Sequence, residues 1–212
     1  MGESSPVVGE GERYKKVHYV TGLLTLFYGV YMVLALVLPL YRVYGVLDGL
    51  VAFSYYRVTY SGAPVTVDEL DRTSYMAAPL VLFTVYMVFS GANLLLALLE
   101  GEDYTVQLRL CFTGGLVGAV SSAVFLGLYS YFFTRAVSTL SFSLDHVTSA
   151  GRLILGSSNV QQFPYTGLLL NPLVHLVLAL ATLLSSTLSI LLHTGRGWPT
   201  KPHEAEGPGH AR

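Results

Sequence analysis

Four long apolar stretches, separated by more polar segments, form the main pattern of this chain. They cover residues 19–40, 76–99, 110–133 and 167–192, and none of them contains Asp, Glu, Lys or Arg. A helix needs about 20 apolar residues to cross a hydrocarbon core about 30 Å thick. Each stretch is long enough to cross a bilayer alone and too long for a strand of a transmembrane barrel. The pattern therefore predicts an all-α membrane protein, built as a bundle of four transmembrane helices.

The first long connection, residues 41–75, does not have the composition of a linker. Aromatic and β-branched residues dominate residues 51–60, and a Ser-Gly-Ala-Pro turn sequence follows before Val65-Thr66-Val67. This pattern is typical of a β-hairpin. The polar residues 68–72 are interpreted either as a short turn or as the capped start of the second helix.

The second long connection, residues 134–166, alternates apolar and hydroxyl residues over 137–144, which predicts a further strand. Strands from both long loops can pair, which satisfies edges that are hazardous when they stay exposed. We therefore expect the two loops to form a small β-sheet over the bundle. The alternative is that both loops are amphipathic segments lying on the membrane surface.

Basic residues near the helix ends favour one orientation in the membrane. Arg13, Lys15 and Lys16 directly precede the first apolar stretch, and cytoplasmic loops carry more Lys and Arg than outer loops. The short connection over residues 100–109 lies on the same side as both termini. The sequence thus predicts a cell-membrane protein with both termini cytoplasmic and both long loops outside. The first helix is expected to be a retained signal anchor, because its apolar run exceeds that of a signal peptide and no clear cleavage site follows.

The resulting domain organisation has three parts. Residues 1–18 are predicted to be a cytoplasmic N-terminal segment, and residues 19–193 the transmembrane domain. Residues 194–212 are polar and rich in Pro and Gly, which predicts a disordered cytoplasmic tail.

The composition agrees with the membrane interpretation and excludes several other classes. Hydrophobic residues make up 52% of the 212 residues and charged residues only 12%, about half the charged share of a soluble domain. With a formal net charge of −1, the chain has no basic surface for nucleic acid. Cys111 is the single cysteine, so neither an intramolecular disulfide nor a thiol-rich metal site can form.

The third apolar stretch carries two stripes of small residues at a spacing of four. Small residues let helix backbones approach closely in membranes, within a bundle or between copies in an oligomer. The predicted packing residues are Gly114, Gly118 and Ser122 in one stripe and Gly115, Ala119, Ala123 and Gly127 in the other.

Few polar groups lie within the apolar stretches. Asn93, Tyr86 and His175 are the candidates for polar contacts inside the bundle, either between helices or toward a cavity. The absence of ionisable Asp, Glu, Lys and Arg from the stretches argues against ion-coupled transport and proton pumping. No phosphate-binding glycine loop, metalloprotease motif or hydrolase nucleophile motif occurs. We therefore expect no catalytic residues, no cofactor and no metal ligands.

Histidines offer the one redox hypothesis. A pair of histidines on facing helices can hold a haem, and His18 and His193 lie at similar depth near the inner ends of the first and fourth helices. His175 is about 27 Å from His193 along the helix, so those two cannot share an iron. Interfacial anchoring is the alternative role for His18 and His193, and a hydrogen bond to a neighbouring helix is the alternative for His175.

The layout resembles that of the tetraspan proteins, the tetraspanins and claudins, which also have inside termini, two outer loops and a tight inner connection. Claudin-type outer loops form a small sheet, which the resemblance implies here as well. The resemblance is one of topology, because the paired loop cysteines and the cysteine-glycine motif of these families are missing from this chain.

These observations favour a structural role. We expect a scaffold or accessory subunit that acts through helix packing and outer-loop contacts, with the lipid bilayer and other membrane proteins as partners, in a homo-oligomer or a hetero-complex. An oligomeric pore, a transporter component or a lipid-binding protein is the alternative. A membrane enzyme or redox subunit that uses His18, His175 or His193 is the third hypothesis.

Overall fold

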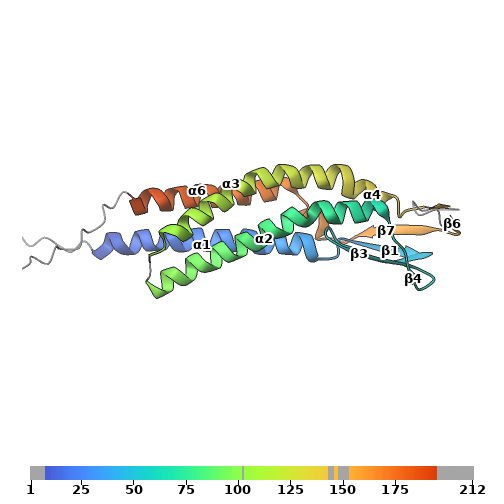
Figure 1. Cartoon of the computed structure of the whole chain (residues 1–212), viewed down its shortest axis with the longest axis horizontal. Coiled ribbons are helices and arrows are strands. Elements are labelled where there is room, and N and C mark those ends of the chain that lie inside the picture. The colour runs from blue at the N-terminus through green and yellow to red at the C-terminus, as the bar shows by residue number, and fades with distance from the viewer. Residues whose placement is uncertain (1–7, 102, 143–145, 148–152, 195–212) are drawn as a thin grey trace, which may run out of the picture.

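Four long helices lie side by side in the computed structural model and form an elongated bundle with a small sheet at one end (Figure 1). The structure describes residues 8–101, 103–142, 146–147 and 153–194. The long helices are α1 (Val8–Val37), α2 (Asp68–Glu100), α3 (Thr105–Gly127) and α6 (Pro172–Thr194). The start of α1, the end of α6 and the connection from α2 to α3 lie at the end opposite the sheet (Figure 1). The predicted tail falls outside the described residues from residue 195 onward, as do residues 1–7.

All four long helices are long and apolar enough to cross a membrane, which confirms that part of the prediction. Their outward faces are apolar as well as their inward faces. On α6 the exposed side chains recur every three or four residues, so they form one stripe along the helix. They are Leu173, Val177, Leu180, Leu184, Leu188 and Leu191. Exposed leucines and valines at this density are typical of helices surrounded by lipid.

The second and third helices begin earlier than the apolar pattern indicates. Helix α2 starts at Asp68 rather than at residue 76, so the polar residues 68–72 are its first turn. Asp68, Glu69 and Asp71 lie in that turn, where acidic side chains interact favourably with the positive end of the helix dipole. Helix α3 starts at Thr105 rather than at residue 110, and the Asp103 carboxylate accepts the Thr105 backbone N–H at 3.0 Å. The apolar run therefore shows which part of each helix suits lipid, and both helices begin before that run, at polar residues.

The predicted fourth helix over residues 167–192 is two helices. A short turn, α5 (Thr166–Leu169), is followed by α6, which begins at Pro172. Proline suits the first turn of a helix because its missing N–H needs no partner there. The Asn171 side-chain oxygen accepts the Leu173 N–H at 3.0 Å, which caps α6 at this point.

The sheet has five antiparallel strands in the order β4-β3-β2-β1-β7. Its strands are β1 (Tyr41–Gly45), β2 (Leu47–Val51), β3 (Tyr56–Tyr60), β4 (Ala63–Pro64) and β7 (Ser158–Gln162). The register pairs Tyr41 with Gln162 and Gly45 with Ser158, so both long loops contribute to one sheet. A separate pair joins β5 (His146–Val147) to β6 (Leu153–Ile154).

Two strand predictions differ from the structure. The predicted hairpin started at residue 51, but Val51 ends β2 and the β3–β4 hairpin starts at Tyr56. The predicted strand over 137–144 is wrong within the described residues, where Phe142 alone forms a bridge, to Ser158. Instead, α3 continues through a π-helical turn, η1 (Leu128–Phe133), into α4 (Thr134–Ser138). Phe133, Ala136, Val137 and Leu140 are all buried at helical spacing, and this tertiary burial overrides the local alternation.

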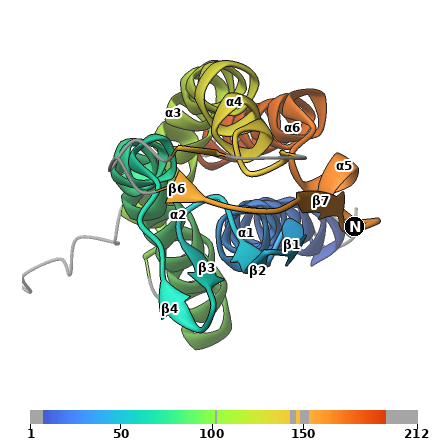
Figure 2. The ribbon, with the colours of Figure 1, turned by 90° about the vertical axis from the view of Figure 1, so that its right-hand side faces the viewer.

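One hydrophobic core runs from the bundle into the sheet. Phe53, in the loop between β2 and β3, is fully buried, and its ring centroid lies 5.0 Å from those of Phe125 and Phe133. Tyr41 on β1 contacts Phe133 at 5.8 Å. The strands run roughly along the long axis of the molecule (Figure 1), and the view from the sheet end shows β1 and β2 in front of α1 (Figure 2). The sheet therefore packs on the bundle and has a fixed position relative to it.

Helices α1 and α2 pack closely at glycines that the sequence analysis did not single out. A Cβ on Gly91 would lie 2.5 Å from the backbone nitrogen of Leu26, and one on Gly29 would lie 2.8 Å from that of Val88. Backbone atoms cannot give way as a flexible side chain can. Glycine is therefore required at this contact.

We expect Gly91→Ala to destabilise the bundle by about 1–3 kcal/mol, the usual cost of overpacking. The melting temperature, followed by circular dichroism in detergent, should fall by about 2–4 °C for each kcal/mol. Gly127→Ala is the matched control, because no other heavy atom lies within 4 Å of a Cβ there. An equal effect of the two substitutions would contradict this packing.

Candidate functional site

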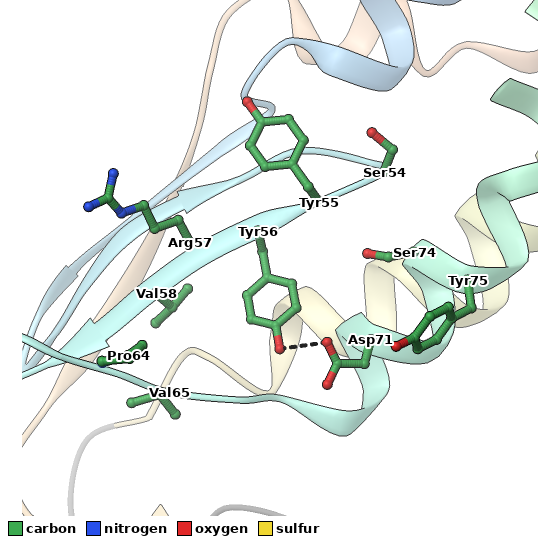
Figure 3. Close-up of a pocket in the computed structure, with 10 residues that line it drawn as sticks. All are labelled: Ser54, Tyr55, Tyr56, Arg57, Val58, Pro64, Val65, Asp71, Ser74 and Tyr75. Carbon is green, nitrogen blue, oxygen red and sulfur yellow. Dashed lines mark hydrogen bonds between the residues drawn. The ribbon is translucent and has the colours of Figure 1, made fainter.

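A groove of about 420 Å³ lies where the sheet meets the start of α2 (Figure 3). It is lined by Ser54, Tyr55, Tyr56, Arg57, Val58, Pro64, Val65, Asp71, Ser74 and Tyr75. Its walls come from the loop before β3, from β3 and β4, and from the first turns of α2. The groove opens at the surface, and the Tyr75 side chain on its rim is 79% exposed.

A hydrogen-bonded tyrosine fixes the floor of the groove. The Tyr56 hydroxyl donates to Oδ1 of Asp71 and accepts the backbone N–H of Val67, both at 2.9 Å. Val67 is the N-cap residue of α2, so this contact ties β3 to the first turn of the helix. Figure 3 shows the Tyr56 ring reaching toward Asp71, with Tyr75 beside it.

Burial raises the pKa of Tyr56 to about 12, and its hydrogen bond to Asp71 and the negative charge of that carboxylate act in the same direction. The hydrogen bond from the Val67 N–H opposes the shift. Tyr56 is therefore a neutral hydrogen-bond donor at physiological pH and holds the groove in one shape.

The loop before β3 is anchored to the end of α1. The Ser54 hydroxyl donates to the Leu36 carbonyl at 2.7 Å, and the Ser54 backbone N–H donates to the same oxygen at 3.2 Å. These bonds satisfy a carbonyl in the last turn of α1 and set the direction in which Tyr55 leaves the loop. Tyr55 is exposed as a result.

The open face of the sheet continues from the rim of the groove. Tyr55 and Arg57 point to the opposite side of β3 from Tyr56 (Figure 3). The register places Arg57 opposite Leu50, Leu50 opposite Arg42, and Arg42 opposite Gln161, so one row crosses four strands. All four side chains are exposed. We call Arg42, Leu50, Arg57 and Gln161 the arginine row.

The two guanidinium groups of the arginine row are available for new contacts. Arg42 and Arg57 lie on strands separated by β2, which places their backbones about 10 Å apart. Neither forms an ion pair with a described residue. Asp48 is exposed on the same face in the neighbouring row, opposite Thr59. Arginine and tyrosine are the residue types that most often anchor protein interfaces.

A second cluster lies at the opposite end of the bundle. The ring centroids of His18 and His193 are 6.1 Å apart, and Tyr104 lies 5.2 and 5.1 Å from them. His193 Nε2 shares a 2.9 Å hydrogen bond with the Thr105 hydroxyl, which in turn donates to Asp103 at 2.6 Å. These Thr105 hydrogen bonds lower the pKa of Asp103.

The histidine pair of the redox hypothesis is thus a packed aromatic cluster. A cleft of about 250 Å³ lies beside His18 and His193, with Tyr14, Lys15 and Tyr104 in its lining. The described residues hold no group of three or more His, Cys, Asp and Glu side chains that suits a metal ion. The contacts of His193 are those of a side chain that ties the end of α6 to the start of α3.

His175 lies near the sheet end and is fully buried. Its Nε2–H donates to the Leu169 carbonyl at 2.7 Å, and its ring packs 4.4 Å from Phe125 and 5.0 Å from Tyr31. The Tyr31 hydroxyl donates to the Leu168 carbonyl at 2.6 Å. Both side chains therefore hold the α5 turn against the bundle, and the hydrogen bond of His175 is to this turn rather than to another long helix.

The structure separates the other polar candidates. The Tyr86 hydroxyl donates to the Leu110 carbonyl at 2.8 Å, which joins α2 to α3. Asn93 is half-buried and has no hydrogen bond to another described residue. A contact that the sequence analysis missed joins α1 to α6, where the hydroxyls of Thr21 and Ser189 lie 2.7 Å apart. Its signal in the sequence is weak, because Ser and Thr are common in membrane helices.

The small-residue stripes of α3 face different neighbours. A Cβ on Gly114 would meet Met87 on α2 at 2.5 Å, and one on Gly115 would meet the Leu183 backbone on α6 at 2.7 Å. Gly118 lies against Tyr28, Phe83 and Ala179, and one turn later the Ser122 hydroxyl bonds to the Gly118 carbonyl. Ala119 is half-buried beside the core, whereas Ala123 and Gly127 are exposed.

No protein family matches this chain, and no curated protein or solved structure is significantly similar to it. The geometry of the described residues is therefore the basis for the functional argument.

We expect Tyr56→Phe to destabilise the protein by about 1 kcal/mol, the usual net value of a lost hydrogen bond. The folded-state pKa of Tyr56 lies above its ordinary value of 10.0. The contribution of its protonated hydroxyl is then fully present below pH 10 and is lost as the pH rises through about 12. The difference in melting temperature between the wild type and Tyr56→Phe should shrink over this range.

Tyr55→Phe is the control for this measurement. It removes the hydroxyl of an exposed neighbour that has no hydrogen bond to a described residue. We expect its effect on the melting temperature to be small. A pH-independent difference for Tyr56→Phe would argue against the Tyr56–Asp71 contact.

Proposed function

We propose that this protein is a structural or accessory subunit of a membrane complex, anchored by four transmembrane helices, with the sheet as its contact surface for a partner protein. The observation that carries this proposal is the arginine row beside the groove, on a sheet locked to the bundle. An exposed surface rich in tyrosine and arginine on a rigid support favours recognition of another protein.

The apolar faces of the long helices support placement in a membrane. Exposed leucines, valines and phenylalanines occur on α1, α2, α3 and α6. A soluble protein seldom leaves so large an apolar surface uncovered. The bundle length also suits this placement, since α6 alone spans about 34 Å at 1.5 Å per residue.

The lysines beside the first long helix support cytoplasmic termini. Lys15 and Lys16 are exposed at the end of the bundle away from the sheet. The positive-inside rule places such residues beside the cytoplasm. In this orientation the sheet, the groove and the arginine row face the outside of the cell membrane.

The attachment of the sheet suits a scaffold. Strand β1 follows the end of α1 closely, β4 leads into α2, and β7 leads through α5 into α6. The sheet is therefore connected to three of the four long helices, in addition to the aromatic contacts of Phe53. A partner bound to the sheet would be held in a fixed orientation relative to the membrane.

A pore remains the alternative, and the packing at Gly118 bears on it. Tyr28, Phe83 and Ala179 meet around this glycine in the middle of the bundle. Tightly packed side chains leave no room there for an aqueous path through one copy. A channel would then have to form between several copies, as in the oligomeric pore weighed from the sequence.

The proposed topology can be tested with single cysteines. We replace Cys111 with Ala and introduce either Lys16→Cys or Arg57→Cys, both at exposed positions. A membrane-impermeant maleimide added to intact cells should label the cysteine at residue 57 and not that at residue 16. Labelling at residue 16 alone would show the opposite orientation. Equal labelling at both positions in sealed cells would argue against four spans.

The partner surface can be tested by affinity purification from the native membrane in mild detergent, read by native mass spectrometry. We expect wild-type protein to retain a stoichiometric partner and Arg42→Gln/Arg57→Gln to lose it at least tenfold, because interface arginines are frequent hot spots. Arg72→Gln/Arg135→Gln removes the same charge outside the arginine row and should retain the partner. A wild-type protein that purifies alone, or equal retention by both variants, would overturn the proposal.

A further inference from the structure

A second cleft, of about 270 Å³, opens on the side of the bundle near the sheet end. It is lined by Glu69 and Arg72 from the first turns of α2, by Phe132 from η1 and by Arg135 from α4. The segments η1 and α4 both contact α2, so the cleft lies between two packed helices. Its lining is separate from the arginine row and from the groove at Tyr56.

The charges of this cleft come from both walls. Arg72 and Arg135 are exposed on different helices, and neither forms an ion pair with a described residue. Glu69 is also exposed and lies about one helical turn before Arg72. The cleft thus presents two guanidinium groups and one carboxylate, with an aromatic ring between the helices.

The cleft lies where the apolar surface of the bundle ends. On α2, exposed apolar residues begin with Met76, one turn after Arg72. On the other wall, Val124 is exposed on α3, and Phe132 lies directly before the helical turn that carries Arg135. Tyr75, on the rim of the neighbouring groove, is highly exposed at this level, as is usual for tyrosines at a membrane interface. Charged groups at this depth meet lipid headgroups.

We propose that the cleft binds the phosphoethanolamine headgroup of a phospholipid in the leaflet nearest the sheet. The phosphate accepts hydrogen bonds from Arg72 and Arg135, because guanidinium groups match phosphate oxygens in both geometry and charge. The ammonium group donates to the Glu69 carboxylate. One acyl chain follows Phe132 along the apolar surface between α2 and α3. This inference rests on the membrane placement of the proposed function.

The balance of charges selects this headgroup among the common phospholipids. A phosphoglycerol headgroup has no cation to pair with Glu69, so this carboxylate gains no opposite charge from the lipid. A phosphocholine headgroup carries a cation without N–H groups, so it cannot donate a hydrogen bond to Glu69. Phosphoethanolamine supplies both the anion and the hydrogen-bonding cation that the cleft complements.

The test compares lipids that share acyl chains and differ in the headgroup. Detergent-solubilised full-length protein is mixed with dioleoyl phosphatidylethanolamine, phosphatidylcholine or phosphatidylglycerol, and bound lipid is counted by native mass spectrometry. We expect wild-type protein to bind phosphatidylethanolamine at least tenfold more tightly than the other two lipids. Arg72→Gln/Arg135→Gln should weaken the binding of all three lipids at least tenfold, since both arginines contact the shared phosphate and each charge-assisted bond is worth about tenfold in affinity.

Two further variants make the test specific. Glu69→Gln should abolish the preference for phosphatidylethanolamine over phosphatidylglycerol, because the ammonium group loses its carboxylate partner. Arg42→Gln/Arg57→Gln removes the same number of positive charges as Arg72→Gln/Arg135→Gln, but from the sheet. This variant should bind lipid as the wild type does. All the substituted side chains are exposed, so circular dichroism should show an unchanged fold.

The outcomes separate this inference from the proposed function. Equal binding of the three lipids by wild-type protein, or a preference that Glu69→Gln leaves unchanged, overturns the headgroup site while the membrane placement stands. If the cysteine-labelling experiment shows no membrane insertion, the proposed function fails and the lipid site fails with it.

Discussion

The contact of Phe53 with Phe125 and Phe133 is the constraint on which the rest of this structure depends. It brings a loop of the sheet against α3 and its continuation η1, and all three rings are fully buried. Aromatic rings bury large areas, and their offset or tilted packing adds to that stabilisation. Because this contact joins the sheet to the bundle, it sets the positions of the groove and the arginine row relative to the four long helices.

Many polar side chains inside the bundle form hydrogen bonds within their own helix, whereas the charged residues lie on the surface. Many Ser and Thr hydroxyls donate to the carbonyl four residues earlier, as Thr84 does to Leu80 and Ser90 to Tyr86. Such bonds satisfy a hydroxyl within its own helix when water is absent. Charged groups instead lie at the two ends of the bundle, and at the sheet end they include the arginine row on the strands and the residues of the second cleft on the helices.

Some features of the fold and of the candidate sites could be predicted from the local sequence, and others could not. The apolar runs and the turn in the first long loop are local features, so the sequence predicts both. The alternation over 137–144 was misread, because Phe133, Ala136, Val137 and Leu140 fit a helix equally well and only their burial distinguishes the two interpretations. The π-helical turn η1 adds a further difficulty. One extra residue in a turn rotates all later residues by about 100°, so no periodicity argument could place Arg135 opposite Arg72.

What the sequence alone determined was the presence of four helices long and apolar enough to cross a membrane, because composition over about 20 residues decides whether a segment partitions into lipid. Only the tertiary structure decided which strands pair, that β7 joins β1, and which side chains share a groove or a cleft. These arrangements depend on contacts between residues far apart in the chain. Each local segment is compatible with more than one such arrangement, and the packing of the whole core selects among them.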